Sequence, residues 1–473
     1  MRHIKIVCTI GPSSQSEDIL TEMKKRGMNV ARLNFSHGEH SEHLEKIRLL
    51  RKVEEKTGES ISILQDLAGP KIRIGEIKNG GMNLERGERI VLTNDPSKVD
   101  GSTIYINYPY LSEDLSVGDL ILLADGNIEL QVIEKGKNKV VCKAIIGGFV
   151  GSHQGVSFPN SNLSVETFTE KDKHDLIFGL ENSVDLVALS FVRNADDIRD
   201  VKVFMRENGK RLPVVAKIER REAIENIDEI IREADGIMVA RGDLGVEVEL
   251  ERVPILQKMI IKKANEAGKP VITATQMLRS MIRNPRPTRA EVCDVANAIF
   301  DGTDCLMLSE ETASGEYPAD SVEFMAKIAD VSEAEFPFWE WLVSNWNDAK
   351  ESGVSTEDAT SHSATVLAKD IDAVAIVAST ASGMTARLVS RFRPKCPIIA
   401  MTPYESTLKS LNLSWGVLPF LVPVFNSTDE LFELASKVVL ERGIGHKGER
   451  IVITAGVPVG VRGKTNLLRA MEL

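Results

Sequence analysis

Two short segments place a lysine near carboxylates where apolar, strand-like runs end. In VVAKIE, Lys217 and Glu219 are two residues apart, so on a strand both side chains point to the same face. In IMVARGDLGVE, Asp243 ends the next run and follows Gly242, which lets the backbone approach a ligand closely. One ammonium beside two carboxylates suits a divalent metal that carries a phosphorylated anion. A structural ion pair at a strand end explains these residues equally well at this point.

The same pattern recurs along the chain. Apolar runs that end in polar residues cover 5–11, 30–36, 62–67, 185–191, 214–219, 237–243, 270–276 and 305–311. Helical patterns separate most of them, at about 17–26, 39–56, 196–207, 221–233, 253–267, 289–300 and 321–333. Strands alternating with helices predict a parallel sheet, and eight repeats predict closure into a (β/α)8 TIM barrel. The mouth of that barrel would collect the polar strand ends, which are Arg32, Asn34, Ser36, Asp66, Ser190, Lys217, Glu219, Asp243, Thr275 and Glu311.

Length and composition narrow the class of protein. A chain of 473 residues predicts two to four domains at about 150 residues each. The net charge of −11 argues against broad nucleic-acid binding, so an anionic substrate would be attracted by local charge or a metal. No apolar run approaches the roughly 20 residues that span a bilayer, and the first residues lack a secretory signal. We therefore expect a cytoplasmic enzyme without membrane contact, whose five scattered cysteines are reduced thiols.

Two stretches interrupt the alternation. Residues 69–168 contain short β-rich runs between turn signals and predict an inserted all-β domain, a β-barrel B domain. Such a domain would be a lid that excludes water from the barrel mouth, or a passive ornament; Lys71 and Arg73 in the entering segment favour the lid. The catalytic A domain then comprises 1–68 and 169–340.

A tryptophan-rich segment near 336–358 precedes a third domain, 341–473. Its tryptophans are expected in an interface core, and its alternating strands and helices predict an open α/β domain. Two of its loops combine hydroxyls, glycines and basic residues, as a phosphate site at a helix N-terminus would. A plain helix cap explains the first loop nearly as well. The candidate effector residues are Thr380, Ser382, Gly383, Thr385 and Arg462.

Long motifs over essentially the whole chain resemble the pyruvate kinase family. They are CTIGPSS, ARLNFSHG, QDLAGPKIR, LSFVR, AKIE, MVARGDLGVE, TATQML, PRPTRAEVCDVANAIFDGTD and LMLSEETASGEYP. The resemblance implies a barrel, an inserted lid and a C-terminal regulatory domain in a homotetramer. It also implies the glycolytic transfer of a phosphoryl group from phosphoenolpyruvate to ADP, which gives pyruvate and ATP.

The resemblance also implies roles for individual residues. Glu219 and Asp243 would hold Mg²⁺ or Mn²⁺, and Lys217 and Arg32 would stabilise the phosphoryl group in flight. The substrate carboxylate would meet Thr275 and the backbone amides of Gly242 and Asp243. Ser309 and Glu311 would belong to the relay that protonates the enolate. Residues at positions that meet the nucleotide or its metal are Asn34, His37, Arg73 and Lys171.

The chain departs from the family pattern around the monovalent cation. Many members bind K⁺ through a threonine and carry a glutamate in the GPxIR stretch, whereas this chain has Leu67 and Lys71 there, and Ile74 follows Arg73. An ammonium from Lys71 would replace K⁺, so we expect activity without K⁺. The alternative is that Lys71 points to solvent and K⁺ binds weakly. The other residues of this region are Asn34, Ser36 and Asp66. A lesser departure is Glu310, where many relatives have glycine.

Two other functions fit part of the pattern. An aldolase-like or enolase-like barrel also combines lysine with Mg²⁺ carboxylates, but a Schiff-base lysine prefers a less acidic setting than Lys217 beside Glu219. A non-catalytic effector-binding relative would have lost one of the four central residues, and all four are present: Lys217, Glu219, Asp243 and Thr275.

Overall fold

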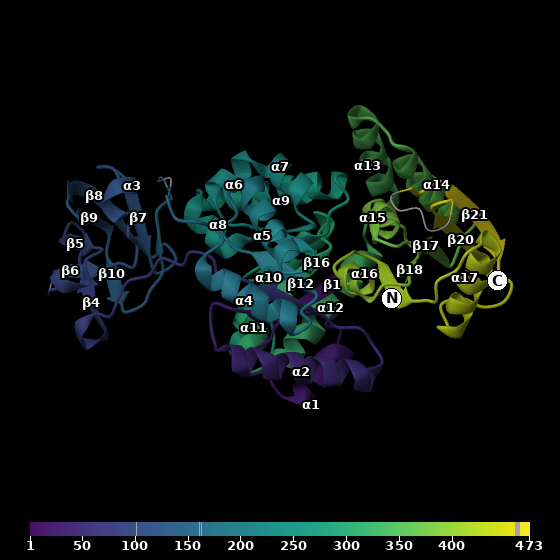
Figure 1. Cartoon of the computed structure of the whole chain (residues 1–473), viewed down its shortest axis with the longest axis horizontal. Coiled ribbons are helices and arrows are strands. Elements are labelled where there is room, and N and C mark those ends of the chain that lie inside the picture. The colour runs from purple at the N-terminus through teal and green to yellow at the C-terminus, as the bar shows by residue number, and fades with distance from the viewer. Residues whose placement is uncertain (101, 160, 162, 459–463) are drawn as a thin grey trace.

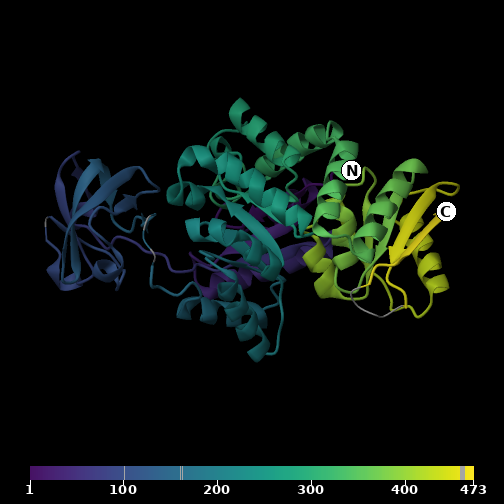
Figure 2. The same ribbon diagram turned by 90° about the horizontal axis from the view of Figure 1, so that it is seen from above.

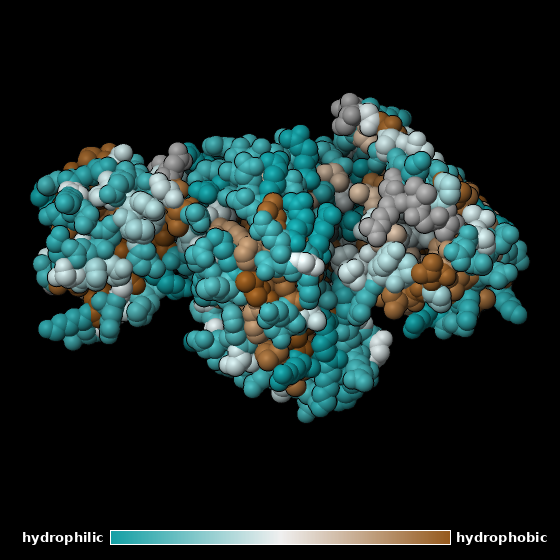
Figure 3. All heavy atoms as spheres, in the orientation of Figure 1, coloured by the Kyte–Doolittle hydropathy of each residue, from teal (hydrophilic) through white to brown (hydrophobic). Residues whose placement is uncertain are grey.

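Three parts lie in a row along the long axis of the molecule (Figures 1 and 2). The computed structural model describes residues 1–473 except 101, 160, 162 and 459–463. The β-rich insert lies at one end, the barrel in the middle and the C-terminal domain at the other end. The face in Figure 3 is mostly hydrophilic, and the described residues include no helix that is long and apolar enough to cross a membrane.

The central part is a closed eight-stranded barrel, as predicted. Its strands follow the order β1-β16-β15-β14-β13-β12-β3-β2, and every neighbouring pair is parallel. All eight predicted strands are confirmed. They are β1 (Lys5–Thr9), β2 (Val30–Asn34), β3 (Ser62–Asp66), β12 (Leu186–Leu189), β13 (Val214–Ile218), β14 (Gly236–Ala240), β15 (Val271–Ala274) and β16 (Cys305–Leu308).

Helices surround this barrel. The predicted helix 221–233 is wrong in one respect, because it is two helices. The backbone of Asn226 leaves the helical region between them, and the side-chain Nδ2 of Asn226 donates to the Arg193 carbonyl, 3.0 Å away. The longer helices are α1 (Glu17–Lys25), α2 (His40–Thr57), α4 (Glu170–Glu181), α5 (Ala195–Glu207), α9 (Val253–Glu266), α10 (Arg289–Phe300) and α12 (Pro318–Ala334). The shorter ones are α6 (Arg221–Glu225), α7 (Ile227–Glu233), α8 (Arg241–Glu247) and α11 (Glu310–Ala313), with 3₁₀ turns at Leu250–Arg252 and Arg279–Ile282.

The insert after β3 is all-β apart from one short helix. It forms a two-stranded and a six-stranded sheet around one apolar core, so the expected closed barrel is replaced by two open sheets. The elements are β4 (Gly81–Leu84), β5 (Arg89–Thr93), β6 (Thr103–Tyr105), α3 (Leu111–Asp114), β7 (Leu120–Leu123), β8 (Ile128–Gly136), β9 (Lys139–Ile146), β10 (Gly148–Gly151) and β11 (Val156–Ser157), with 3₁₀ turns at Lys78–Gly80 and Pro96–Lys98.

The C-terminal part is an open sheet with helices on both faces. Its strand order is β19-β18-β17-β20-β21, and only β21 is antiparallel. Helices α14 and α15 pack on one face, and α17 packs on the other. The strands are β17 (Ala375–Ser379), β18 (Ile398–Thr402), β19 (Val417–Leu421), β20 (Arg450–Ala455) and β21 (Leu467–Glu472), the last of which we did not predict. The helices are α13 (Phe338–Ser352), α14 (Thr356–Asp370), α15 (Met384–Arg391), α16 (Glu405–Leu411) and α17 (Thr428–Glu441).

The tryptophans of α13 differ in their surroundings. Trp341 packs against the barrel core and donates to the Arg391 carbonyl, 3.0 Å away. Trp346 stacks on His362 with the ring centroids 4.0 Å apart. Trp339 is 45% exposed, so the prediction of an interface core is wrong for this residue in the single chain.

The C-terminal domain closes the barrel end opposite the mouth. Leu413, which follows α16, is 2% exposed and joins the apolar side chains inside the barrel. The Lys409 ammonium pairs with Glu54, and its carbonyl accepts from the Ser62 hydroxyl at 2.6 Å. Arg393 pairs with Asp304 at 2.9 Å, with both side chains buried. The bottom of the barrel core is therefore completed by residues of another domain.

Replacing Leu413 with Ala tests this closure. The change leaves a cavity at the bottom of the barrel, so we expect a loss of about 2–5 kcal/mol in unfolding free energy. Leu250→Ala is the matched control, because Leu250 is 71% exposed. The measurement is urea unfolding of both variants by circular dichroism. Equal midpoints for the two variants would show that Leu413 contributes little to the barrel core.

Candidate active site

A buried lysine forms the centre of the site at the carboxyl ends of the strands. The Nζ of Lys217, on β13, lies 2.6 Å from Ser190 Oγ and 2.8 Å from Glu219 Oε1. It lies 3.3 Å from Asp66 Oδ1, at the end of β3. Burial disfavours the ammonium, but the two carboxylates outweigh it and raise the pKa of Lys217 well above its usual value. The lysine is therefore a fixed cation rather than a base or a nucleophile.

Asp66 ties Lys217 to Arg32. Arg32 Nε donates to Asp66 Oδ2 at 2.6 Å, and Arg32 Nη1 donates to the Thr9 hydroxyl at 2.9 Å. Burial opposes ionisation of Asp66, yet the two cations prevail and lower its pKa. The site thus presents two cations held by one carboxylate at the barrel mouth.

Two carboxylates near Lys217 have the donor chemistry for a hard divalent cation. Glu219 Oε2 accepts the Phe191 amide at 2.7 Å, which fixes the carboxylate. Burial and the nearby charge of Asp243 both raise the pKa of Glu219, so a cation between the two carboxylates would relieve an unfavourable charge. The described residues include no group of three metal-ligating side chains. Two carboxylates fit Mg²⁺ or Mn²⁺, which would complete its coordination with substrate and water oxygens.

A helix start lies beside these carboxylates. Strand β14 ends at Ala240 and α8 follows at once, so Gly242 and Asp243 lie in its first turn. The Gly242 amide donates to Thr275 Oγ1 at 2.8 Å. Thr275 has a φ of 71°, which is costly for a β-branched residue and is typical of functional sites. Because its oxygen accepts from Gly242, the Thr275 hydroxyl keeps its proton to donate to a carboxylate.

Ser309 and Glu311 lie at the neighbouring strand end. The buried Glu311 carboxylate accepts the Ser309 amide at 2.8 Å and the Leu278 amide at 3.1 Å. Burial raises the pKa of Glu311, and the adjacent Glu310 charge adds to the effect. Glu311 therefore links the loops that follow β15 and β16.

The expected nucleotide residues are only partly gathered. Burial lowers the pKa of His37, and the charges of Lys71, Arg73 and Arg32 lower it further, so these cations are its neighbours. Arg73 Nη1 donates to the His153 carbonyl in the insert at 3.0 Å. Lys171 pairs with Asp175 at 2.6 Å and bonds the Phe35 carbonyl.

Asn34, Ser36 and Lys71 are three of the residues predicted for a monovalent-cation region. Asn34 Oδ1 accepts the Ser36 amide at 3.1 Å. Burial and the charge of Lys217 lower the pKa of Lys71. The carboxylates of Asp66, Asp243 and Glu219 act in the opposite direction but do not outweigh these two effects. The charge of Lys71 therefore interacts with the charges of the site. Among the described contacts, however, Asp66 forms its ion pairs with Lys217 and Arg32 and not with Lys71.

The candidate effector loop connects β17 to α15. Thr380 Oγ1 accepts the Gly383 amide at 2.9 Å, and Gly383 has a φ of 85°. Thr385 Oγ1 lies 2.8 Å from Thr465 Oγ1, which brings the two predicted loops together. Ser382 is exposed. Arg462 lies outside the described residues.

Sequence reasoning missed several supporting residues. Thr9 ends β1 and orients Arg32, and its place at a polar strand end was a usable signal. Phe191, with a φ of 57°, presents its amide to Glu219, and an aromatic residue gave no such signal. Arg387 Nη2 donates to the Ser382 carbonyl at 3.0 Å and so fixes the candidate effector loop.

Comparisons with known proteins agree with this geometry. Residues 1–322 match the family model of the pyruvate kinase barrel domain, and residues 358–471 match that of the pyruvate kinase alpha/beta domain. A pyruvate kinase of Clostridium perfringens is 46% identical over 475 residues and covers 100% of both chains. One of Clostridium acetobutylicum is 45% identical and covers 99% of each chain.

A solved structure agrees over the same extent. The crystal structure of a pyruvate kinase from Cryptosporidium parvum superposes with a TM-score of 0.94 and 35% identity, covering 100% of this chain and 96% of that one. The Clostridium perfringens relative and the solved structure both match over the barrel and the C-terminal domain. The chain is a phosphotransferase and belongs to the pyruvate kinase family.

Proposed function

We propose that this enzyme transfers the phosphoryl group of phosphoenolpyruvate to ADP with Mg²⁺ or Mn²⁺, giving pyruvate and ATP in glycolysis. The observation that carries the proposal is Lys217, a buried ammonium held by Asp66 and Glu219 beside Asp243. Phosphoryl transfer needs a positioned cation rather than covalent catalysis. A Schiff base would need a neutral amine, which this setting disfavours.

Glu219 and Asp243 would hold the divalent cation, which when bound neutralises substrate oxygens. Lys217 and Arg32 flank the position of the phosphoryl group. Arg32 is oriented through Nε and Nη1 by Asp66 and Thr9, so its orientation is set before substrate binds. The substrate carboxylate would accept from the Thr275 hydroxyl and the first turn of α8.

Once the phosphoryl group has left, the enolate carbon needs a proton. Lys217 is held charged on the phosphoryl side by two carboxylates, which makes it a poor donor. Ser309 lies at the adjacent strand end, and its loop is fixed by Glu311. Ser309 would relay a proton from water, and Glu311 would keep that relay in place.

The insert, residues 69–168, would close over the barrel mouth and exclude water. Support comes from Arg73, which enters the insert and bonds His153 within it, while lying near His37 of the barrel. Closing the insert would bring Arg73 to a nucleotide bound near Asn34, His37 and Lys171. The phosphates of ADP would then bind beside the cations Lys71, Arg73 and Arg32.

Lys71 would make the reaction independent of K⁺. Its ammonium lies in the field of Asp66, Asp243 and Glu219, where a bound monovalent cation would otherwise balance charge. Leu67 offers no hydroxyl to complete a K⁺ shell.

The C-terminal loop would bind a phosphorylated allosteric effector in a cytoplasmic homotetramer. Thr380, Ser382, Gly383 and Thr385 surround the start of α15, and Arg462 would complete the site. Exposed apolar residues on α12 and α13, such as Val331 and Val343, support subunit contacts. A nucleoside monophosphate, a sugar monophosphate and fructose bisphosphate all carry the required phosphate.

Replacing Lys217 with Met tests the central role. We expect kcat to fall by about 10²–10³-fold or more, because the cation at the phosphoryl group is lost. Mn²⁺ binding, followed by electron paramagnetic resonance, should persist because both carboxylates remain. Lys263→Met is the control, since Lys263 lies on α9 and, among the residues that the structure describes, pairs only with Asp228 at the surface. Retained turnover in Lys217→Met would refute the assigned role.

Omitting K⁺ tests Lys71. In potassium-free buffer we expect full pyruvate formation by the unmodified enzyme and a loss of about tenfold or more in Lys71→Met, partly restored by KCl. Lys78→Met is the control variant, because Lys78 is an exposed lysine in the same entering segment of the insert. If the unmodified enzyme is active only after KCl is added, the assignment as a kinase stands and the proposed role of Lys71 is refuted.

Ser382→Asp tests the effector loop. An added carboxylate beside the phosphate position should weaken binding of an activating phosphate ester by about tenfold or more. Fructose 1,6-bisphosphate, glucose 6-phosphate and AMP would each be titrated by calorimetry. Ser363→Asp, an exposed change on α14, is the control. If no ester binds, or if both variants bind equally, the loop is not the effector site.

A further inference from the structure

A buried ion pair begins at the residue that follows the candidate metal ligand Glu219. This residue, Arg220, is 7% exposed. Its Nε lies 3.6 Å from Glu247 Oε2, and its Nη2 donates to Glu222 Oε1 at 3.2 Å. Glu247 is 8% exposed, and among the described residues Arg220 is its only ion-pair partner. Glu247 therefore depends on Arg220 for a counter-charge.

Glu247 lies on the same helix as the second candidate metal ligand. Helix α8 carries Asp243 in its first turn and ends at Glu247. Residues four apart on a helix lie on the same face, so both carboxylates are directed to the side of α8 where Arg220 lies. Two consecutive residues after β13, Glu219 and Arg220, are thus matched with two residues one turn apart on α8.

The two metal carboxylates need a tie of this kind. The charge of Asp243 acts on Glu219, and the two groups repel each other while no cation lies between them. The start of α8 is tied to the loop after β15, because Arg241 Nη2 donates to the Thr275 carbonyl at 2.8 Å. Among the described ion pairs and hydrogen bonds, only the pair of Arg220 and Glu247 joins α8 to the segment after β13.

We propose that Arg220 is a positioning residue for the divalent cation and that, through Glu247, it holds Asp243 at a fixed spacing from Glu219. This inference rests on the metal site proposed above. A cation binds more tightly when its ligands are already in place, because less order has to be imposed on binding. Glu222 contributes by orienting the guanidinium. The alternative is that the pair only stabilises α6 and α8.

Arg220→Met separates positioning from a simple effect of charge. Removing a positive charge beside a cation site would by itself tighten Mn²⁺ binding, whereas loss of positioning weakens it. We expect the dissociation constant of Mn²⁺ to rise by about fivefold or more. It is measured by electron paramagnetic resonance on the full-length enzyme without substrate. Burial raises the pKa of Glu247 to about 7, so the buffer is kept about one pH unit higher, where this carboxylate is mostly ionised.

Three further variants locate the effect. Arg220→Lys should recover part of the lost affinity, because an ammonium can still pair with Glu247. Glu247→Gln should weaken Mn²⁺ binding, and combining it with Arg220→Met should add less than about twofold to the weaker single variant, since both remove the same tie. Arg221→Met is the matched control, because the neighbouring Arg221 is exposed and its only described ion pair is with Glu225. The control should bind Mn²⁺ no more weakly than the unmodified enzyme.

Urea unfolding followed by circular dichroism checks that each variant is folded. Unchanged or tighter Mn²⁺ binding by Arg220→Met overturns this inference and leaves the assignment as a kinase in place, even if that variant is less stable. If Arg220→Met does not fold, Glu247→Gln decides, and affinity equal to that of the unmodified enzyme overturns the inference. If the unmodified enzyme binds no Mn²⁺, the proposed metal site is refuted together with the role of Arg220.

Discussion

The site depends on one buried carboxylate that holds two cations in place. Asp66 pairs with Lys217 and with Arg32, so residues from β3, β13 and β2 meet at one point. Each of these charges would be costly to bury alone. Together they are stable only if the barrel is closed in the observed register, since a shift by one residue would turn each side chain to the other face. The precision of the site is therefore a property of the whole barrel.

Much of this arrangement was readable from the residues. Apolar runs ending in polar side chains predicted all eight barrel strands and the gathering of Lys217, Glu219 and Asp66 at the mouth, because parallel strands bring their carboxyl ends together. The two hydroxyl-rich and glycine-rich loops of the C-terminal domain were also expected to lie together, and Thr385 contacts Thr465.

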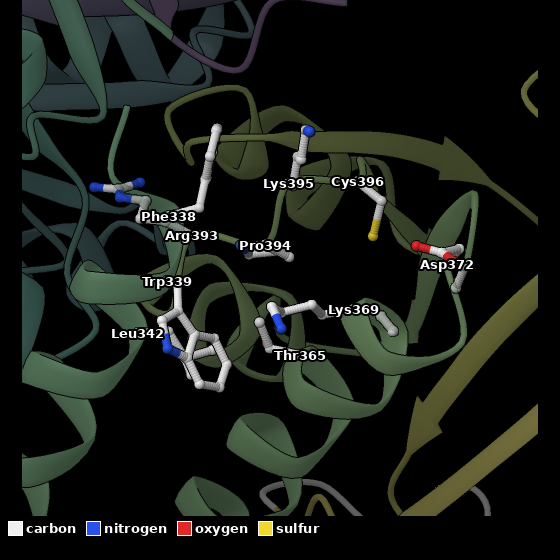
Figure 4. A pocket seen from close by; sticks show the side chains of 12 residues that line it. Phe338, Trp339, Leu342, Thr365, Lys369, Asp372, Arg393, Pro394, Lys395 and Cys396 are labelled. Carbon is white, nitrogen blue, oxygen red and sulfur yellow. The ribbon is translucent and has the colours of Figure 1, made fainter. Parts of the chain in front are cut away.

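Other features could not be predicted because they depend on backbone geometry or distant packing. The run through Asp243 reads as a strand, but it turns into α8 at Arg241, which places the amide of Gly242 on Thr275. The positive φ of Phe191 and Thr275 is imposed by the surrounding loops. The edge strand β21 has a weak apolar pattern, since one face is exposed. Trp339 is apolar in sequence yet lies at the surface, over a cavity that only the packed helices create (Figure 4).

The closure of the barrel by Leu413 bears on how the protein is made. During translation the chain leaves the ribosome from its amino end, and domains generally fold as they emerge. All eight barrel strands are complete by Leu308, more than a hundred residues before the side chain that fills the bottom of the barrel is synthesised. For that interval the nascent barrel has an open apolar end. The C-terminal domain is then the last part of the barrel core to arrive, and a ribosome that stalls before α16 would leave a chain prone to aggregation.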